Sequence, residues 1–402
     1  MEITEKILNR KTFIKLGTIF FTIVFANVFF GCVNAPKKSD STLVLNAPKM
    51  TLNQEKLQVV DSDFMFLRTF VEYYYALSLE NKKNLPVYQS LQNFTGWCVG
   101  DAHVENFGFI VQSAEGEPIS TVFTVNDMDD SGPCPLILDL DRLLLSASLV
   151  EKSFLQENFV SQFHKYYLSG LNQEKVKMPD GLMKKQMSSL KKGIVVQPKK
   201  ILGPLFVRDK NSSEVSPVKR KNISQLLPAY KILDVISTVK KNGGSAGLQR
   251  YQVLVQNKKS EILHFELKPL VTPAIELIAS GSIPEDSIRI ANSVRFFQKE
   301  MVNENYKVVT LDNSSFLLRP RYWGNLDVEM NELSSAEKQE TVLYEAYVLG
   351  KMHAASLTLS LNQWNQAMES LDMKTWRSEL DSLNQHYTSR KFSPGSSSRD
   401  QK

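Results

Sequence analysis

Residues 97–109 read WCVGDAHVENFGF, and residues 123–133 read FTVNDMDDSGP. Their polar members are Asp101, His103 and Asn106 in the first stretch, then Asp127, Asp129 and Asp130 in the second. Carboxylates this close to one another repel unless a cation or a hydrogen-bond donor offsets their charge. The two stretches therefore predict one shared polar site, and they require a fold that brings both to the same place.

The residues around these stretches predict alternating strands and helices. Residues 106–113 and 118–127 read as two strands joined by a short turn. Apolar residues at helical spacing cover 63–81, 136–154 and 156–171. Further downstream the pattern predicts hairpins over 248–269 and 307–323, and helices over 288–302, 338–360 and 362–387. This alternation favours a mixed α+β fold.

Composition sets broad limits on the kind of protein. The chain has 402 residues, 23% of them charged, and a formal net charge of +5. This is ordinary globular composition, long enough for two domains or lobes. The basic excess is too small to indicate a nucleic-acid partner, and we expect a monomer.

The N-terminus predicts export. Lys6, Arg10, Lys11 and Lys15 precede an uncharged run over 16–31 that ends at Cys32. A basic segment before a short apolar core is typical of a signal peptide, here residues 1–31. The closing FFGC resembles a lipobox, which makes Cys32 the lipidation site, and Arg10-Lys11 resembles a twin-arginine signal. An uncleaved membrane anchor is the alternative. Both interpretations predict an extracytoplasmic, membrane-anchored protein.

The acidic pattern excludes two common metal sites and favours a third use. A calcium loop starting at Asp127 would need a bidentate glutamate at its twelfth position, where the chain has Leu138. The five histidines are scattered, which argues against zinc. Phosphoryl transfer needs a carboxylate beside the attacking hydroxyl and oxygen ligands for Mg²⁺. Asp101, Asn106 and Asp127 meet that need.

The same residues carry a resemblance to known families. Residues 99–106 (VGDAHVEN), then Asp127 and Asp139, follow the order seen in aminoglycoside phosphotransferases and choline-kinase-like enzymes, with Val99 in place of their first histidine. The chain resembles more closely a bacterial family catalogued as a domain of unknown function. That resemblance covers roughly residues 60–360 and is carried by 98–108, 123–129 and 132–143.

The resemblance implies a protein-kinase-like fold with two lobes. A helical large lobe would carry the catalytic loop, and a small antiparallel β lobe would be inserted or permuted after it. The expected parts are a tether over 32–58, the catalytic-loop part of the large lobe over 59–225 with a Lys-rich insertion, the small lobe over 226–330, C-terminal helices over 331–388 and a disordered tail over 389–402. The insertion is either a solvated face or a basic patch for phosphate or lipid headgroups.

The resemblance also implies roles for single residues. Asp101, with His103 beside it, would orient or deprotonate an acceptor hydroxyl, and Asn106, Asp127 and Asp129 would hold Mg²⁺. A glycine-rich turn and a strand lysine would bind the phosphates of ATP or another nucleotide; here they are Gly243, Gly244, Gly247 and Lys268. The acceptor would be a small molecule or a protein.

Several alternatives stay open at this point. Asp101 and His103 could simply tie a turn, the glycines could form a plain hairpin turn, and Lys268 could face solvent. Asp139 could cap its helix or brace the first stretch. Cys98 and Cys134 could pair in an oxidising compartment or remain separate buried thiols. The chain as a whole could be a kinase-fold binding protein without turnover, or a metal-dependent phosphoester hydrolase.

Overall fold

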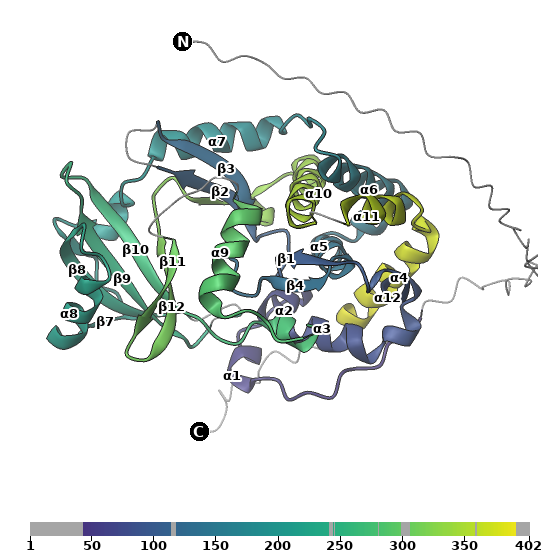
Figure 1. Ribbon diagram of the computed structural model, residues 1–402, viewed down its shortest axis with the longest axis horizontal. Helices are drawn as coiled ribbons and strands as arrows, with labels where there is room; N and C mark the ends of the chain where they lie inside the picture. The colour runs from purple at the N-terminus through teal and green to yellow at the C-terminus, as the bar shows by residue number, and fades with distance from the viewer. Residues whose placement is uncertain are drawn as a thin grey trace, which may run out of the picture. The chain divides into compact units, whose positions relative to one another are not determined.

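The computed structural model describes residues 43–113, 118–240, 244, 246–279, 281–298, 306–357 and 360–390 (Figure 1). The predicted signal peptide, Cys32 and Gly243 lie outside these ranges. The mixed α+β fold is confirmed. No helix within these ranges is long and apolar enough to cross a membrane.

A helical part holds the largest hydrophobic core. Its helices are α2 (Asp63–Thr69), α3 (Val71–Glu80), α4 (Pro86–Leu91), α5 (Ile137–Val150), α6 (Glu157–Leu171), α10 (Ser335–Ser356), α11 (Leu361–Glu369) and α12 (Met373–Thr388). The backbones of α6 and α10 touch because Gly170 and Gly350 have no side chains; a Cβ on Gly170 would lie 2.1 Å from the carbonyl oxygen of Tyr347. Ser334 and Glu337 form a capping box at the start of α10.

The described residues also form an antiparallel sheet of six strands, here called the large sheet. Its strands are β7 (Ser212–Glu214), β8 (Lys231–Val239), β9 (Gln249–Gln256), β10 (Ile262–Pro269), β11 (Lys307–Leu311) and β12 (Ser314–Pro320), in the order β11-β12-β10-β9-β8-β7. Helix α9 (Asp286–Phe297) connects β10 to β11. In Figure 1 it stands between the large sheet and the β1–β4 pair described below.

Alternation along β10 gives the large sheet two different faces. Leu263, Phe265 and Leu267 belong to a hydrophobic cluster that includes Ile223 of α8 (Pro217–Gln225). His264, Glu266 and Lys268 alternate with them and therefore lie on the other face. All six residues are buried, so this strand carries a row of polar side chains inside the protein.

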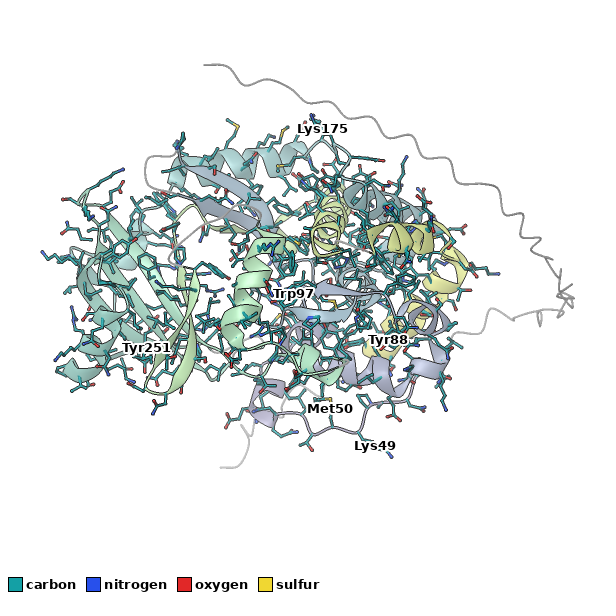
Figure 2. All side chains as sticks on the ribbon, viewed as in Figure 1. Lys49, Met50, Tyr88, Trp97, Lys175 and Tyr251 are labelled. Atoms are coloured by element: carbon teal, nitrogen blue, oxygen red, sulfur yellow. A yellow bond between two sulfur atoms is a disulfide. The ribbon has the colours of Figure 1, made fainter. Side chains whose placement is uncertain are left out.

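Two smaller sheets place the two acidic stretches. In one, β1 (Thr95–Cys98), whose Trp97 is labelled in Figure 2, pairs with β4 (Gly132–Pro135), and the Cys98–Cys134 disulfide joins them. In the other, β2 (Phe107–Gln112) pairs with β3 (Ser120–Val125) and with β13 (Leu326–Asp327). The first loop (residues 99–106) leaves β1 and enters β2, and the second loop (residues 126–131) leaves β3 and enters β4. Both loops therefore emerge side by side.

Three expectations are corrected. Residues 43–58, expected as a tether, pack on the helical part: Leu45 is buried, the Leu43 amide donates to Ser382 Oγ at 3.0 Å, and α1 covers Gln54–Leu57. The single helix expected over 63–81 breaks at Phe70, whose φ of −115° and ψ of 69° are not helical. The last predicted helix is two helices, because the Asp372 side chain caps a new start at α12.

The Lys-rich insertion is ordered in the structure. It contains α7 (Asp180–Lys192) and the short hairpin of β5 (Ile201–Leu202) and β6 (Leu205–Phe206). Figure 1 shows α7 lying along the outer side of β2 and β3.

Candidate functional site

A cavity of about 890 Å³ separates the polar face of the large sheet from the two acidic loops. The sheet contributes Arg250, Gln252, Glu266, Lys268 and Arg319 to its wall, and the loops contribute Asp101, His103, Asn106, Asp127, Asp129 and Asp130. The structure therefore brings together the residues that the sequence placed in one site. Arg250 and Glu266 are additions that the sequence did not single out.

The first loop is held in place by the buried carboxylate of Asp139. Asp139 accepts hydrogen bonds from the amides of Val99, at 2.6 Å, and Gly100, at 3.2 Å. His353 Nε2 lies 3.2 Å from the same carboxylate, and its Nδ1 lies 2.7 Å from the Tyr167 hydroxyl. Of the roles left open for Asp139, bracing the loop is the one that the geometry supports.

Asp101 is oriented by two neighbours. Arg142, which is fully buried, donates to its Oδ1 from Nε, at 3.1 Å, and from Nη2. His103 Nε2 lies 3.6 Å from its Oδ2. Burial lowers the pKa of His103 to about 3, so this ring is neutral. The Glu105 amide donates to its Nδ1 at 3.2 Å, which leaves the ring proton on Nε2, facing Asp101.

Asn106 locks the two loops together. Its amide nitrogen donates to the carbonyls of Asp101, at 3.0 Å, and Asp127, at 3.1 Å. Its Oδ1 accepts from the Asp127 amide at 3.0 Å. An amide oxygen has two lone pairs, so Oδ1 keeps one acceptor position while it holds the second loop.

Lys268 lies between two carboxylates of the second loop. Its Nζ is 2.5 Å from Asp127 Oδ2 and also contacts Asp129 Oδ2. Burial acts to lower the pKa of this ammonium, but the two carboxylates outweigh burial and raise it. The contact joins residues that are 141 positions apart. Lys268 therefore does not face solvent.

The two carboxylates differ in their proton affinity. Burial acts to raise the pKa of Asp127, but Lys268 and Arg319 outweigh it and hold that pKa well below its usual range. Burial and the neighbouring Asp127 raise the pKa of Asp129 to about 7. Asp127 is therefore the permanent anion of the pair, and Asp129 exchanges its proton near neutral pH.

The donor set fits a hard cation such as Mg²⁺, although it is small. No group of three or more His, Cys, Asp or Glu side chains in the described part of the chain is arranged to hold a metal ion. The candidate set has two carboxylates and one amide, and Mg²⁺ commonly completes its shell with water and substrate phosphates. Oδ1 of Asp127 and Oδ1 of Asp129 are buried beside the cavity, and neither accepts a hydrogen bond from an N–H group of the described residues. Such oxygens have lone pairs to offer a cation.

A buried ion network backs the sheet wall. Glu266 accepts from Arg250 Nη1 at 3.1 Å and from Arg319 Nη2 at 2.8 Å. Arg319 Nη1 also lies 3.6 Å from Asp127 Oδ1, so the network extends to the second loop. One feature of the sequence could have indicated this network. Polar His264, Glu266 and Lys268 alternate with apolar residues in β10, a strand that is buried on both faces.

The glycine turn between β8 and β9 reaches the cavity in part. Gly244 lines it, and its carbonyl accepts from Lys56 Nζ at 2.5 Å. Gly247 has a φ of +81° and donates its amide to Lys240 at 2.9 Å, as a turn residue does. The remaining glycine of this prediction, Gly243, lies outside the described residues.

We expect Gly100→Ala to destabilise the site more than Gly247→Ala. Both glycines have a φ of +81°, so both variants carry the same backbone strain of about 1–2 kcal/mol. A Cβ on Gly100 would lie 1.8 Å from the Asp130 carbonyl oxygen, whereas one on Gly247 meets nothing within 4 Å. Chemical unfolding should show at least about 2 kcal/mol of extra loss for Gly100→Ala. Equal losses would mean that the loops are not in contact.

A family model matches residues 51–178 and 207–390, which is most of the chain. The protein belongs to the family described as "Uncharacterized protein conserved in bacteria (DUF2252)". This confirms the predicted resemblance to a bacterial family of unknown function. The DUF2252 match contains both loops, Lys268, Glu266 and Arg319, and it leaves out residues 179–206. Searches of the curated proteins and of the solved structures found no match.

Proposed function

We propose that this protein is a kinase-like phosphotransferase that moves a phosphoryl group from a Mg²⁺-bound nucleotide to a hydroxyl group. The observation that carries the proposal is the meeting of Lys268 with Asp127 and Asp129 in a cavity that also contains Asp101. A cation for phosphates, oxygen ligands for Mg²⁺ and a carboxylate for the acceptor are the groups that this reaction needs.

Each residue then has one task. Asp101 accepts or orients the proton of the attacking hydroxyl, and Arg142 and His103 hold it in place. Asn106, Asp127 and Asp129 bind Mg²⁺, which neutralises charge on the phosphates. Lys268 contacts both carboxylates in the structure, so it exchanges them for phosphate oxygens when the nucleotide enters. This exchange keeps every charge in the buried site compensated.

The order of the parts supports a circularly permuted kinase-like fold. The antiparallel sheet with its glycine turn and strand lysine follows the two loops in sequence, and α9 is inserted between β10 and β11. The C-terminal helices α10 to α12 then return to the helical part, where α10 braces the first loop through His353. The acceptor, the export of the chain and its lipid anchor at Cys32 stay predictions.

One observation favours a second candidate, a kinase-fold binding protein without turnover. In the structure, Asp127 is already in an ion pair with Lys268, and Asp101 is already in an ion pair with Arg142. A protein that keeps these pairs on binding a ligand would hold it without transferring a group.

Ligand-dependent stability tests the nucleotide and metal sites on residues 33–402. At a hundredfold excess over Kd, binding adds about 2.7 kcal/mol, and we expect Mg²⁺ with a nucleotide to raise the wild-type Tm by several degrees. Asp127→Ala should abolish this shift. Asp180→Ala, which removes an exposed carboxylate outside the cavity, should retain it. No shift of the wild type with any nucleotide would refute the proposal.

A further inference from the structure

Residues 179–206, here called the insertion, carry a net charge of +5, which equals that of the whole chain. They contain six lysines and one aspartate. The other 374 residues hold 42 basic and 42 acidic side chains and are neutral in sum. The family model leaves these residues out, as it does residues 1–50 and 391–402. The residues that the family model matches hold 32 basic and 38 acidic side chains, so the insertion adds a concentrated positive charge to an acidic family core. This contrast indicates a feature with its own partner.

The insertion also exposes large apolar side chains beside these lysines. Met187 and Leu202 are 71% and 78% exposed, and Leu190 and Leu205 are also exposed. Leu202 and Leu205 flank the Gly203-Pro204 turn at the tip of the β5–β6 hairpin. Lys199 and Lys200 are exposed directly before this hairpin. On α7, Met187 lies between Lys184 and Lys191 at helical spacing, on the same face.

This exposure is fixed by the fold. Ser189 Oγ donates to the Gly324 carbonyl at 2.6 Å, which ties α7 to the segment before β13. Phe206 is buried with Val196, Ile236 and Leu254, and its amide donates to Asp234 Oδ2 at 2.9 Å. The hairpin is therefore clamped at its base while its tip stays in solvent. The described residues therefore leave Leu202 and Leu205 exposed.

We propose that the insertion docks this protein onto an anionic lipid bilayer. Exposed leucines and methionine enter the boundary between headgroups and acyl chains, and flanking lysines bind the lipid phosphates. A single-stranded nucleic acid fits less well as the partner, because proteins bind its bases by stacking them on aromatic side chains. Phe206 is the one aromatic residue of the insertion, and it is buried. The inference does not depend on the proposed phosphotransfer or on lipidation of Cys32.

Docking would bring the cavity close to the membrane. Ile236 and Leu254 lie on the same face of the large sheet as Glu266 and Lys268, as the strand register requires. The hairpin packs on that face through Phe206, whose ring is 5.1 Å from that of His264. Asp209, three residues after the hairpin, lines the cavity. The insertion thus packs beside the site, although none of its own residues lines the cavity.

Vesicle sedimentation of residues 43–402 tests the proposal. This piece contains every described residue and belongs to one compact unit, and it lacks the apolar N-terminal run that would bind lipid by itself. Vesicles of phosphatidylcholine alone are compared with vesicles that contain about one third phosphatidylglycerol. We expect binding to the anionic vesicles only, weakening as salt rises.

Two double variants separate the apolar and the charged contributions. Leu202→Ser with Leu205→Ser, and Lys191→Glu with Lys199→Glu, should each weaken binding to anionic vesicles by at least about tenfold. The matched controls Val218→Ser and Lys258→Glu change exposed residues outside the insertion and should bind as the wild type does. All six substituted positions are exposed, and an unchanged Tm verifies folding.

Three results would overturn the inference. They are wild-type binding that does not distinguish the two vesicles, binding that both double variants retain, and absence of vesicle binding. An oligonucleotide that binds the wild type and not the lysine variant, with no vesicle binding, would assign the insertion to nucleic acid. Capture of a protein partner by the leucine tip, again without vesicle binding, would assign it to a protein.

Discussion

Asp101→Asn is expected to lower the rate of phosphate transfer by about 10²–10⁴, the usual contribution of a general base. Asparagine keeps the shape of the side chain and can still accept a hydrogen bond from Arg142, but it cannot take the hydroxyl proton. Binding of Mg²⁺ and nucleotide should be retained, because Asp127, Asp129 and Lys268 are unchanged. The measurement compares single-turnover transfer with the nucleotide-dependent shift in Tm.

Asp130→Asn is the matched control in the same cavity. Asp130 Oδ1 accepts the Ala274 amide at 2.7 Å, a bond that asparagine can keep, and we expect less than about a tenfold loss of rate. Equal losses for both variants would remove the special role of Asp101. Ligand binding with no transfer, in wild type and variant alike, would favour the binding protein. Release of phosphate from an ester with metal but without nucleotide would favour a hydrolase.

Glu266→Gln should reduce the free energy of unfolding by about 3–5 kcal/mol, the usual result of removing one partner from a buried ion network. Arg250 and Arg319 would lose the carboxylate that they share, in a site where Glu266 is only 4% exposed. Denaturant unfolding measures the loss. Because Arg319 also approaches Asp127, nucleotide binding should weaken in the same variant.

The matched control is Glu214→Gln. Glu214 also accepts from an arginine, Arg208, at 2.8 Å, but it is 74% exposed. An exposed ion pair contributes about 0–1 kcal/mol because water screens it. If both variants lost the same stability, burial of the Glu266 network would not contribute to folding as we infer.

Local features of the fold followed from the sequence, whereas long-range pairings did not. The strands of both hairpins, the capping box at Ser334 and the two acidic loops depend on near neighbours, and patterns of period 2 or 3.6 report them. The partners of Glu266 and Asp101 depend on how distant segments meet. Arg142 reads as one residue of an apolar helix, and nothing in that pattern shows that its guanidinium reaches back to Asp101.

The site residues followed the same division. Asp101, Asn106, Asp127 and Lys268 were selected by chemistry and order, and the structure brings them into one cavity. The sequence left the partner of Lys268 open, since a lysine in a strand gives no indication of what it faces. The cysteine pair was open for the same reason, because only the register of β1 with β4 brings Cys98 beside Cys134.

The packing of α10 and α12 on the N-terminal half of the chain determines when the first loop can form during synthesis. The brace on the first loop needs His353, which follows its partner Asp139 by 214 residues. The amide of Val87, at the start of α4, donates a hydrogen bond to the Glu379 carboxylate, 292 residues later. A chain emerging from the ribosome lacks both contacts until α10 and α12 are made. Such distant contacts slow folding, so the acidic loops acquire their final geometry only after α10 and α12 have been made.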